Sequence, residues 1–338
     1  MNISVKCFNQ DEIKAFIMSN HTLGKCDVTG ESDVNVVDIN EVAEFFIDLL
    51  SIFSESTDGN SLVSVINRDW DIFKSDDIAS TILNEICRKG NLSLNANSMV
   101  VYSDEVYLSV KKWNEIKETL KWKQRYFTGR FVDDEMRWDV YLSSNDIIDK
   151  NSLFYRGRLN ILESTCIEDK NKMGAPPALL ATAGRANPQG IPFLYLTENE
   201  NTVMYETRAL FGDKLSIGRF RVTKKLNVLN FNKKPNLFSD YSEDLYESVA
   251  DSVRGYFLRE AISKDLSKPM RRYDNKEIEY VPTQFICEYV KNVTGADGIQ
   301  FASSLHEGGV NLVLFDVNNA VCEKVEVKEI GKYQLEFK

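Results

Sequence analysis

The chain has 338 residues, of which 43% are hydrophobic and 27% charged, with only 17 glycines and 7 prolines. These globular proportions exclude a disordered, collagen-like or low-complexity chain, and the length fits about two domains. Residues 1–150 carry 16 Lys and Arg against 26 Asp and Glu, whereas residues 151–338 carry 25 of each. The acidic first half argues against direct nucleic-acid binding, because phosphates attract a basic surface.

Targeting and membrane signals are not found. No stretch approaches the roughly 20 apolar residues that span a bilayer, and the N-terminus lacks a basic segment followed by an apolar one. In a chain of this size, widely scattered cysteines indicate reduced thiols. We therefore expect a cytoplasmic protein with no membrane partner. The six cysteines are Cys7, Cys26, Cys87, Cys166, Cys287 and Cys322.

The first 150 residues are predicted to form a mostly helical domain. Residues 38–41 have the spacing of a capping box, and apolar residues at helical spacing follow them. The same spacing predicts helices over 76–88 and 105–126. Gly90 is expected to end the first of these two.

The pattern changes near residue 150, where the polar stretch 145–152 is predicted to be a linker. Short β-rich runs follow, with helices between them and no regular βαβ alternation. We therefore expect an α+β domain over residues 151–338, with mixed β-sheets. The predicted strands cover 153–158, 192–197, 215–222, 298–303 and 310–316, and the predicted helices cover 199–211, 241–264 and 282–292.

A search for common catalytic motifs finds no phosphate-binding loop, no dinucleotide fingerprint and no nucleophile elbow. The chain has two histidines, which excludes a metal site built on several of them. Cys7, His21 and Cys26 are conceivable zinc ligands. Structural zinc sites usually pair their cysteines at short spacing, which these lack, so buried thiols and a surface histidine are the simpler interpretation. We expect no metal.

Four segments of the second half carry a family resemblance. Their order and spacing resemble the RES domain family, which is named for an arginine, a glutamate and a serine. The resemblance covers about residues 151–318, and the preceding helical region looks like the N-terminal region of longer RES proteins. The segments are Leu153–Arg158, Gly184–Gly190 running into Phe193–Leu196, Thr202–Glu206, and Gly298–Ser303 followed by Gly308–Phe315.

The resemblance implies a fold similar to ADP-ribosyltransferases and activity on NAD+ as substrate. It implies cleavage of the nicotinamide–ribose bond by water or phosphate, in a toxin that depletes NAD+. Mono-ADP-ribosylation of a cellular protein is the alternative reaction, and a non-catalytic nucleotide-sensing module is the alternative from another class. The resemblance also implies a helix-turn-helix antitoxin or other inhibitor protein as partner. A homo-oligomer is a further option.

The chemistry suits the residues that match the family pattern. Breaking the nicotinamide–ribose bond builds positive charge on the ribose, as in glycoside hydrolysis. Glu206 can supply the stabilising anion, while Arg156 and Arg185 can bind phosphate or ribose oxygens through their guanidinium forks. Each also has a structural interpretation: Arg156 as a surface ion-pair partner, and Glu206 as a favourable charge near a helix start.

Three more residues complete the expected site. Tyr195 can stack on nicotinamide, unless it is simply core, and Ser303 can hydrogen-bond the carboxamide or a ribose hydroxyl. Ser304 should point to the opposite face of its strand. Arg158 shares the face of Arg156 and can make a second phosphate contact. The remaining features near the site are the loop Met173–Pro177, which either shapes the pocket mouth or lies on the surface, and His306, expected in an exposed turn.

Overall fold

The computed structural model describes residues 1–126, 136–160, 166–242, 246–270 and 273–331. Two compact units divide the chain: Met1–Leu108 with Pro235–Arg254, and Ser109–Lys234 with Gly255–Lys338. This division differs from a boundary at residue 150, because most of helix α5 (Leu108–Trp122) and all of strand β6 (Asp146–Ile148) belong to the second unit. In the described ranges, no helix combines the length and apolar character needed to cross a bilayer.

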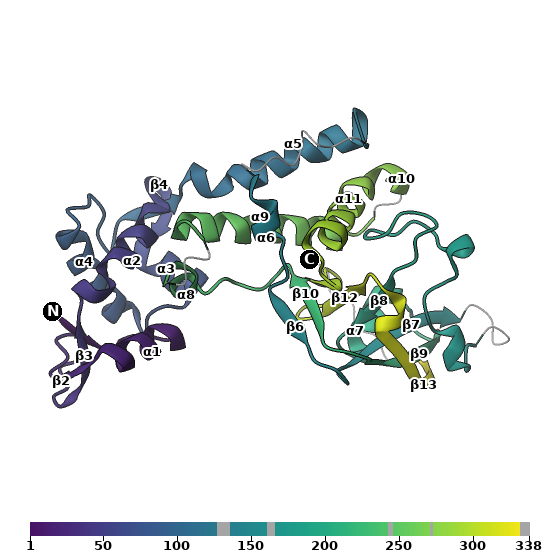
Figure 1. Ribbon diagram of the computed structural model, residues 1–338, viewed down its shortest axis with the longest axis horizontal. Coiled ribbons are helices and arrows are strands. Elements are labelled where there is room, and N and C mark those ends of the chain that lie inside the picture. The colour runs from purple at the N-terminus through teal and green to yellow at the C-terminus, as the bar shows by residue number, and fades with distance from the viewer. Residues whose placement is uncertain (127–135, 161–165, 243–245, 271–272, 332–338) are drawn as a thin grey trace. The chain divides into compact units, whose positions relative to one another are not determined.

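The first unit combines helices with two small antiparallel sheets (Figure 1). One sheet has the strand order β1-β3-β2, and the other pairs β4 with β5. The sequence predicted the helices α2 and α4 of this unit and not its sheets, because β4 is mostly polar and lacks the alternation of a half-buried strand. The elements are β1 (Asn2–Ser4), α1 (Asp11–Asn20), β2 (Thr22–Gly24), β3 (Val34–Asp38), α2 (Asn40–Ser51), β4 (Phe53–Ser61), α3 (Leu62–Trp70), α4 (Asp76–Lys89), β5 (Met99–Tyr102) and α8 (Leu237–Ser242).

The predicted helix after residues 38–41 is confirmed as α2, but the capping box is wrong. The residue at the N-cap is Ile39, which has no capping side chain. The Asp38 carboxylate instead accepts the N–H of Asn40 at 2.9 Å and the N-terminal ammonium at 3.3 Å. The helix predicted over 76–88 is confirmed as α4, and the Ser75 hydroxyl caps it.

The Cys7 and Cys26 thiols meet in the core of this unit, with their sulfur atoms 3.8 Å apart and both side chains fully buried. The ring of His21 lies elsewhere, since its Nδ1 contacts the carbonyl oxygen of Met18 at 2.7 Å. Among the described residues, no third metal-binding side chain joins the two thiols. The paired thiols therefore fit the simpler interpretation as core residues.

The second unit is built on one eight-stranded sheet with the order β13-β9-β7-β8-β12-β11-β10-β6. Figure 1 shows its strands with α7, α10 and α11 beside them. The elements that lie wholly or mostly in this unit are α5 (Leu108–Trp122), α6 (Trp138–Tyr141), β6 (Asp146–Ile148), β7 (Leu153–Asn160), β8 (Leu194–Thr197), α7 (Glu200–Thr207), β9 (Lys214–Val222), β10 (Leu226–Asn230), α9 (Val249–Ser267), α10 (Lys276–Glu279), α11 (Val281–Tyr289), β11 (Gly298–Ala302), β12 (Val310–Leu314) and β13 (Ala320–Glu329).

The sheet is mixed, because β10 and β11 run parallel while the other pairs are antiparallel. The predicted α+β class is therefore confirmed. All five predicted strand runs contain strands, namely β7, β8, β9, β11 and β12. The linker prediction for 145–152 is wrong, since β6 pairs with β10 and the Asn145 amide bonds the carbonyl of Asn230 at 3.1 Å.

The predicted helices exist with different bounds. The helix expected over 199–211 is α7, which ends at Thr207. The helix expected over 241–264 corresponds to the end of α8 and most of α9, and residues 243–245 lie outside the described ranges. The helix expected over 282–292 is α11 continued by a π-helical turn. The helix expected over 105–126 is α5.

Apolar side chains pack on both faces of the sheet. Phe154 of β7 and Phe220 of β9 belong to one core cluster, whereas Leu215 and Ile217 of β9 belong to the other, which includes Val203 of α7. The period of two along β9 produces this split. Helix α7 lies very close to β7, because a Cβ at Gly157 would come within 2.2 Å of Val203 Cγ1.

Candidate functional site

A cavity of about 490 Å³ lies where strands β7 and β8 diverge. The two strands pair only at Tyr155 and Thr197, and both residues line the cavity. The rest of the wall comes from α7, the end of α9, α10 and the strands β11 and β12. The polar and aromatic residues in the lining are Tyr155, Arg156, Arg185, Tyr195, Thr197, Glu206, Thr207, Arg208, Ser267, Lys268, Lys276, Tyr280, Phe301 and Asn311.

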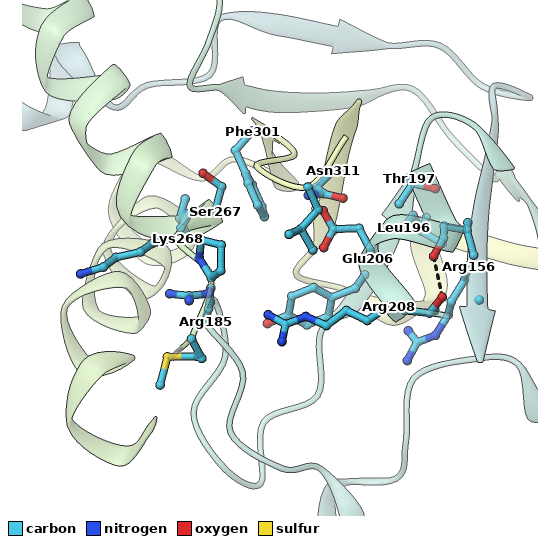
Figure 2. Close-up of a pocket in the computed structure, with 18 of the residues that line it drawn as sticks. Arg156, Arg185, Leu196, Thr197, Glu206, Arg208, Ser267, Lys268, Phe301 and Asn311 are labelled. Atoms are coloured by element: carbon cyan, nitrogen blue, oxygen red, sulfur yellow. Dashed lines mark hydrogen bonds between the residues drawn. The ribbon is translucent and has the colours of Figure 1, made fainter. Parts of the chain in front are cut away.

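Glu206 of α7 is fixed by two hydrogen bonds to the same carboxylate oxygen. The Ser303 hydroxyl donates to Oε1 at 2.7 Å, and the Asn311 side-chain amide donates to it at 2.8 Å. The second oxygen, Oε2, has no partner within the described residues. Figure 2 shows Asn311 next to the Glu206 carboxylate. One oxygen is therefore held while the other is available to a ligand.

Ser303 reaches Glu206 because of the turn that follows β11. Its hydroxyl oxygen accepts the backbone N–H groups of Leu305 and His306 while its hydrogen goes to the carboxylate. The Ser304 hydroxyl points elsewhere and donates to the carbonyl of Ser267. Of the two serines, Ser303 is the one that meets the glutamate.

The position of Glu206 on its helix excludes a stabilising interaction with the helix dipole. Helix α7 begins at Glu200 and ends at Thr207, so the carboxylate lies in the last turn. The partial charge there is negative, which disfavours an anion. The interpretation of Glu206 as a charge near a helix start is therefore wrong. The bonds from Ser303 and Asn311 offset this cost.

Arg156 of β7 brings a poorly solvated positive charge to the cavity. Its Nη1 atom is buried and has no hydrogen-bond partner in the described structure. Burial, together with repulsion from Arg158, lowers the pKa of Arg156 to about 10. The structure does not bring Arg158 itself to the cavity lining. That guanidinium donates to the carbonyl of Gly174 at 2.8 Å and so holds the loop whose Met173 side chain is core.

Arg185 lies across the cavity, in the loop before β8. Its guanidinium carbon is 5.1 Å from the centre of the Tyr280 ring, and Nη1 donates to the carbonyl of Asp265 at 3.1 Å. Burial lowers the pKa of Arg185 as well. The loop backbone is fixed by α11, because the Thr283 hydroxyl donates to the Arg185 carbonyl at 2.7 Å.

Tyr195 lines the cavity with its ring and shapes the Gly184–Gly190 turn with its hydroxyl. The hydroxyl donates to Asn187 Oδ1 at 2.7 Å and accepts the N–H of Ala186 at 3.1 Å. Burial raises the pKa of Tyr195. A Cβ at Gly184 would lie 2.6 Å from the tyrosine oxygen, so this close approach requires glycine.

Two further residues of the site, Arg208 and Asn311, were assigned no role in the sequence analysis. Arg208 ends α7 in the left-handed conformation, with a φ of 52°, at a position where glycine is usual. A side chain in that conformation costs about 1 kcal/mol, and such strain collects at functional sites. Figure 2 shows Arg208 extending toward Arg185. Asn311 was noticed only as part of a strand motif.

The charges of the lining are unbalanced. Among its described residues Glu206 is the one carboxylate, against the five cations Arg156, Arg185, Arg208, Lys268 and Lys276. None of these cations forms an ion pair with Glu206 in the described structure. A cavity of this kind attracts a polyanionic ligand and presents it with one isolated negative charge.

His306 is half-buried, in contrast to the exposed turn that was expected. Its ring stacks on that of Tyr205 with centroids 4.7 Å apart, and its Nδ1 contacts the Thr202 hydroxyl at 2.9 Å. These contacts tie the turn that carries Ser303 to the helix that carries Glu206.

Comparison with known proteins identifies the family to which the chain belongs. The model of the RES domain matches residues 168–336, which is half of the chain. A solved structure described as the M. tuberculosis MbcT–MbcA toxin–antitoxin complex is 14% identical, with a TM-score of 0.31, covering 54% of this chain and 87% of that one. None of the curated proteins compared with the chain matches it. The resemblance inferred from the motifs is therefore confirmed, and the chain belongs to the RES domain family.

Proposed function

We propose that the protein cleaves the nicotinamide–ribose bond of NAD+. The observation that carries this proposal is a single carboxylate, Glu206, held by Ser303 and Asn311 in a cavity otherwise lined by cations. NAD+ contains a pyrophosphate, which suits the cations, and a ribose that becomes positively charged when nicotinamide leaves, which suits the carboxylate.

The proposed reaction uses both the cations of the site and its one carboxylate. Arg156 and Arg185 bind the pyrophosphate and place the nicotinamide ribose beside Glu206. As the bond from ribose C1′ to the nicotinamide nitrogen breaks, its electron pair neutralises the pyridinium ring. Glu206 Oε2 stabilises the positive charge that develops on the ribose, because preorganised charge is usually the largest catalytic contribution. Water, which releases a proton, or an oxygen of phosphate then forms the new bond to C1′.

The remaining residues serve binding and orientation. Tyr195 provides an aromatic wall for nicotinamide, and its hydroxyl is already used to hold the Gly184–Gly190 turn. Ser303 acts through Glu206 as a positioning residue, in place of the substrate contact expected from the sequence. Arg208 faces the cavity without an ion-pair partner in the described ranges, so it serves as a further phosphate ligand.

Toxicity by NAD+ depletion in the cytoplasm, neutralised by an inhibitor protein, belongs to the same proposal. It rests on membership of the RES domain family and on the resemblance that pointed to it. No metal takes part in the proposed reaction, because nicotinamide leaves as a neutral group.

The test follows nicotinamide release from NAD+ by purified protein, with and without phosphate, and identifies the product by mass. The proposal predicts release with ADP-ribose as product in plain buffer or a phosphorylated ADP-ribose when phosphate is needed. Glu200→Gln, on the same helix outside the cavity, is the matched control for Glu206→Gln. A labelled protein band without free ADP-ribose would instead favour protein ADP-ribosylation, and binding without turnover would favour a nucleotide sensor.

A further inference from the structure

Helix α5 lies outside the family match, which begins at residue 168, yet it contacts the end of α9 in the same compact unit. Trp113 is fully buried, and its indole N–H donates to Asp265 Oδ2 at 2.8 Å. The Lys117 ammonium donates to the same oxygen, also at 2.8 Å. Two side chains from α5 thus converge on one carboxylate oxygen of α9.

Asp265 is also the residue that holds Arg185. While its carboxylate binds α5, its backbone carbonyl accepts the Arg185 Nη1–H at 3.1 Å. The pair of Lys117 and Asp265 is three-quarters shielded from water, with exposed side-chain fractions of 23% and 25%. A shielded ion pair gains little stability over apolar packing but fixes geometry.

A second link joins α5 to the other side of Arg185. The Lys121 ammonium donates to Glu279 Oε2 at 2.8 Å. Glu279 ends α10 and precedes Tyr280, whose ring lies under the Arg185 guanidinium. Helix α5 therefore fixes both elements that hold this arginine, the carbonyl of α9 and the ring after α10.

A small cavity of about 110 Å³ confirms that α5 stands directly behind the wall of the site. Its lining includes Lys117 and Lys121 of α5 together with Asp265 and Glu279. Arg185 lines this small cavity and also the large one. Arg185 thus lies between α5 and the proposed nucleotide site.

We propose that α5 is a positioning element for Arg185, so that a segment preceding the family region completes the nucleotide site. The inference rests on the proposed function for its kinetic readout. A half-buried guanidinium needs a rigid support to meet a phosphate in one orientation, and ligand-binding groups are generally held by such a surrounding shell. Lys117 and Trp113 provide it through Asp265.

The first test is Lys117→Met in the full chain, which keeps the bulk of the side chain and removes the charge. We expect KM for NAD+ to rise about tenfold with kcat changed less than about twofold, because Arg185 binds the phosphates equally in the ground and transition states. Lys117→Arg should restore KM. Lys112→Met, on an exposed face of the same helix, is the matched control.

A double variant separates positioning from general damage to the fold. If Lys117 acts through Arg185, then Lys117→Met should raise KM no further in an Arg185→Met background, since coupled residues are not additive. An unchanged KM in Lys117→Met, a loss that Lys117→Arg does not restore, or full additivity with Arg185→Met would each overturn the inference.

A binding measurement keeps this inference distinct from the proposed reaction. Calorimetric titration with inorganic pyrophosphate reports on Arg185 whether or not NAD+ is cleaved. We expect the Kd for pyrophosphate to rise about tenfold in Lys117→Met and to stay unchanged in Lys112→Met. If the Kd for pyrophosphate shifts but NAD+ is not cleaved, the proposed function is wrong and the role of α5 stands. If wild type and Lys117→Met bind pyrophosphate with equal Kd, the role of α5 is wrong and the proposed function is unaffected.

Discussion

At the scale of single residues, several features of the site are unfavourable for the stability of the folded protein. The Glu206 carboxylate lies at the negative end of α7, and Nη1 of the Arg156 guanidinium is buried without a hydrogen-bond partner in the described ranges. Arg208 adopts a strained backbone conformation. Each feature costs stability in the unliganded protein. The proposed substrate would offset these costs, through its negative phosphates and through the positive charge that develops on its ribose as nicotinamide leaves.

Glu206→Gln should separate stability from activity. The glutamine carbonyl can still accept the bonds from Ser303 and Asn311, and the unfavourable charge at the end of α7 disappears. We expect the free energy of unfolding to stay within about 0.5 kcal/mol of wild type or to rise, as measured by urea unfolding. A loss of more than about 2 kcal/mol would mean that the carboxylate is structural.

Arg156→Met should stabilise the unliganded protein by roughly 1 kcal/mol, because it removes a poorly solvated charge. The folded-state pKa of Arg156, about 10, lies below its ordinary value of 12.5, so the cost is fully present below pH 10 and falls as the pH rises above it. Urea unfolding of both proteins between pH 8 and about 11 measures this. A difference that grows with pH, or a destabilised variant, would contradict the prediction.

The sequence predicted the residues that match the family motif and missed those set by tertiary geometry. Arg156, Arg185, Tyr195 and Glu206 were all named from their motifs, and all line one cavity. Arg208 carried no signal, because the first glycine after α7 is Gly212 and the helix was expected to run to residue 211. The helix instead ends at Thr207, with Arg208 as its cap.

At the scale of elements, the site depends on how closely α7 approaches β7. Gly157 permits that approach, since a Cβ there would overlap the Val203 side chain of α7. Three residues later on the same helix, Glu206 meets Ser303 and Asn311. A shift of α7 away from the sheet would therefore break the hydrogen bonds that hold the carboxylate.

Gly157→Ala should destabilise the protein by about 2–3 kcal/mol and lower the activity, because overpacking forces α7 outward. Adding Val203→Ala makes room for the new methyl group, so the double variant should recover at least about 1 kcal/mol relative to the sum of the single changes. Thermal unfolding and nicotinamide release measure the two effects. Strict additivity would show that the two side chains do not meet.

The sequence predicted those strands whose own residues show a clear apolar pattern. The apolar runs of β8, β9, β11 and β12 lie in the centre of the sheet and were recognised. Strand β6 was taken for a linker, because three residues show no period and its partner β10 begins only at Leu226. Strand β13 was missed because seven of its ten residues are charged or exposed to solvent.

At the scale of the whole molecule, the site draws on more of the chain than the family match covers. The match begins at residue 168, whereas Arg156 of β7 and the supporting helix α5 come earlier. The cations of the cavity come from four separate parts of the chain, and folding brings them together without neutralising them. A bound pyrophosphate would relieve that repulsion.

ADP-ribose should therefore raise the melting temperature, and salt should reduce the effect. Binding at 100 times Kd adds about 2.7 kcal/mol of stability, and raising NaCl from about 0.05 to 0.5 M screens the partly exposed cations. Nicotinamide riboside, which has the ribose and no pyrophosphate, should stabilise far less. Equal stabilisation by both compounds, or no dependence on salt, would contradict a pyrophosphate-binding cavity.

The most direct test of the central claim is the rate of nicotinamide release from NAD+ by wild type and by Glu206→Gln, each at saturating NAD+. We expect wild type to release nicotinamide and Glu206→Gln to be slower by about 10²–10³, with Glu200→Gln equal to wild type. Equal rates in wild type and Glu206→Gln, or no release by wild type with or without phosphate, would contradict the assignment of this cavity as an NAD+-cleaving site.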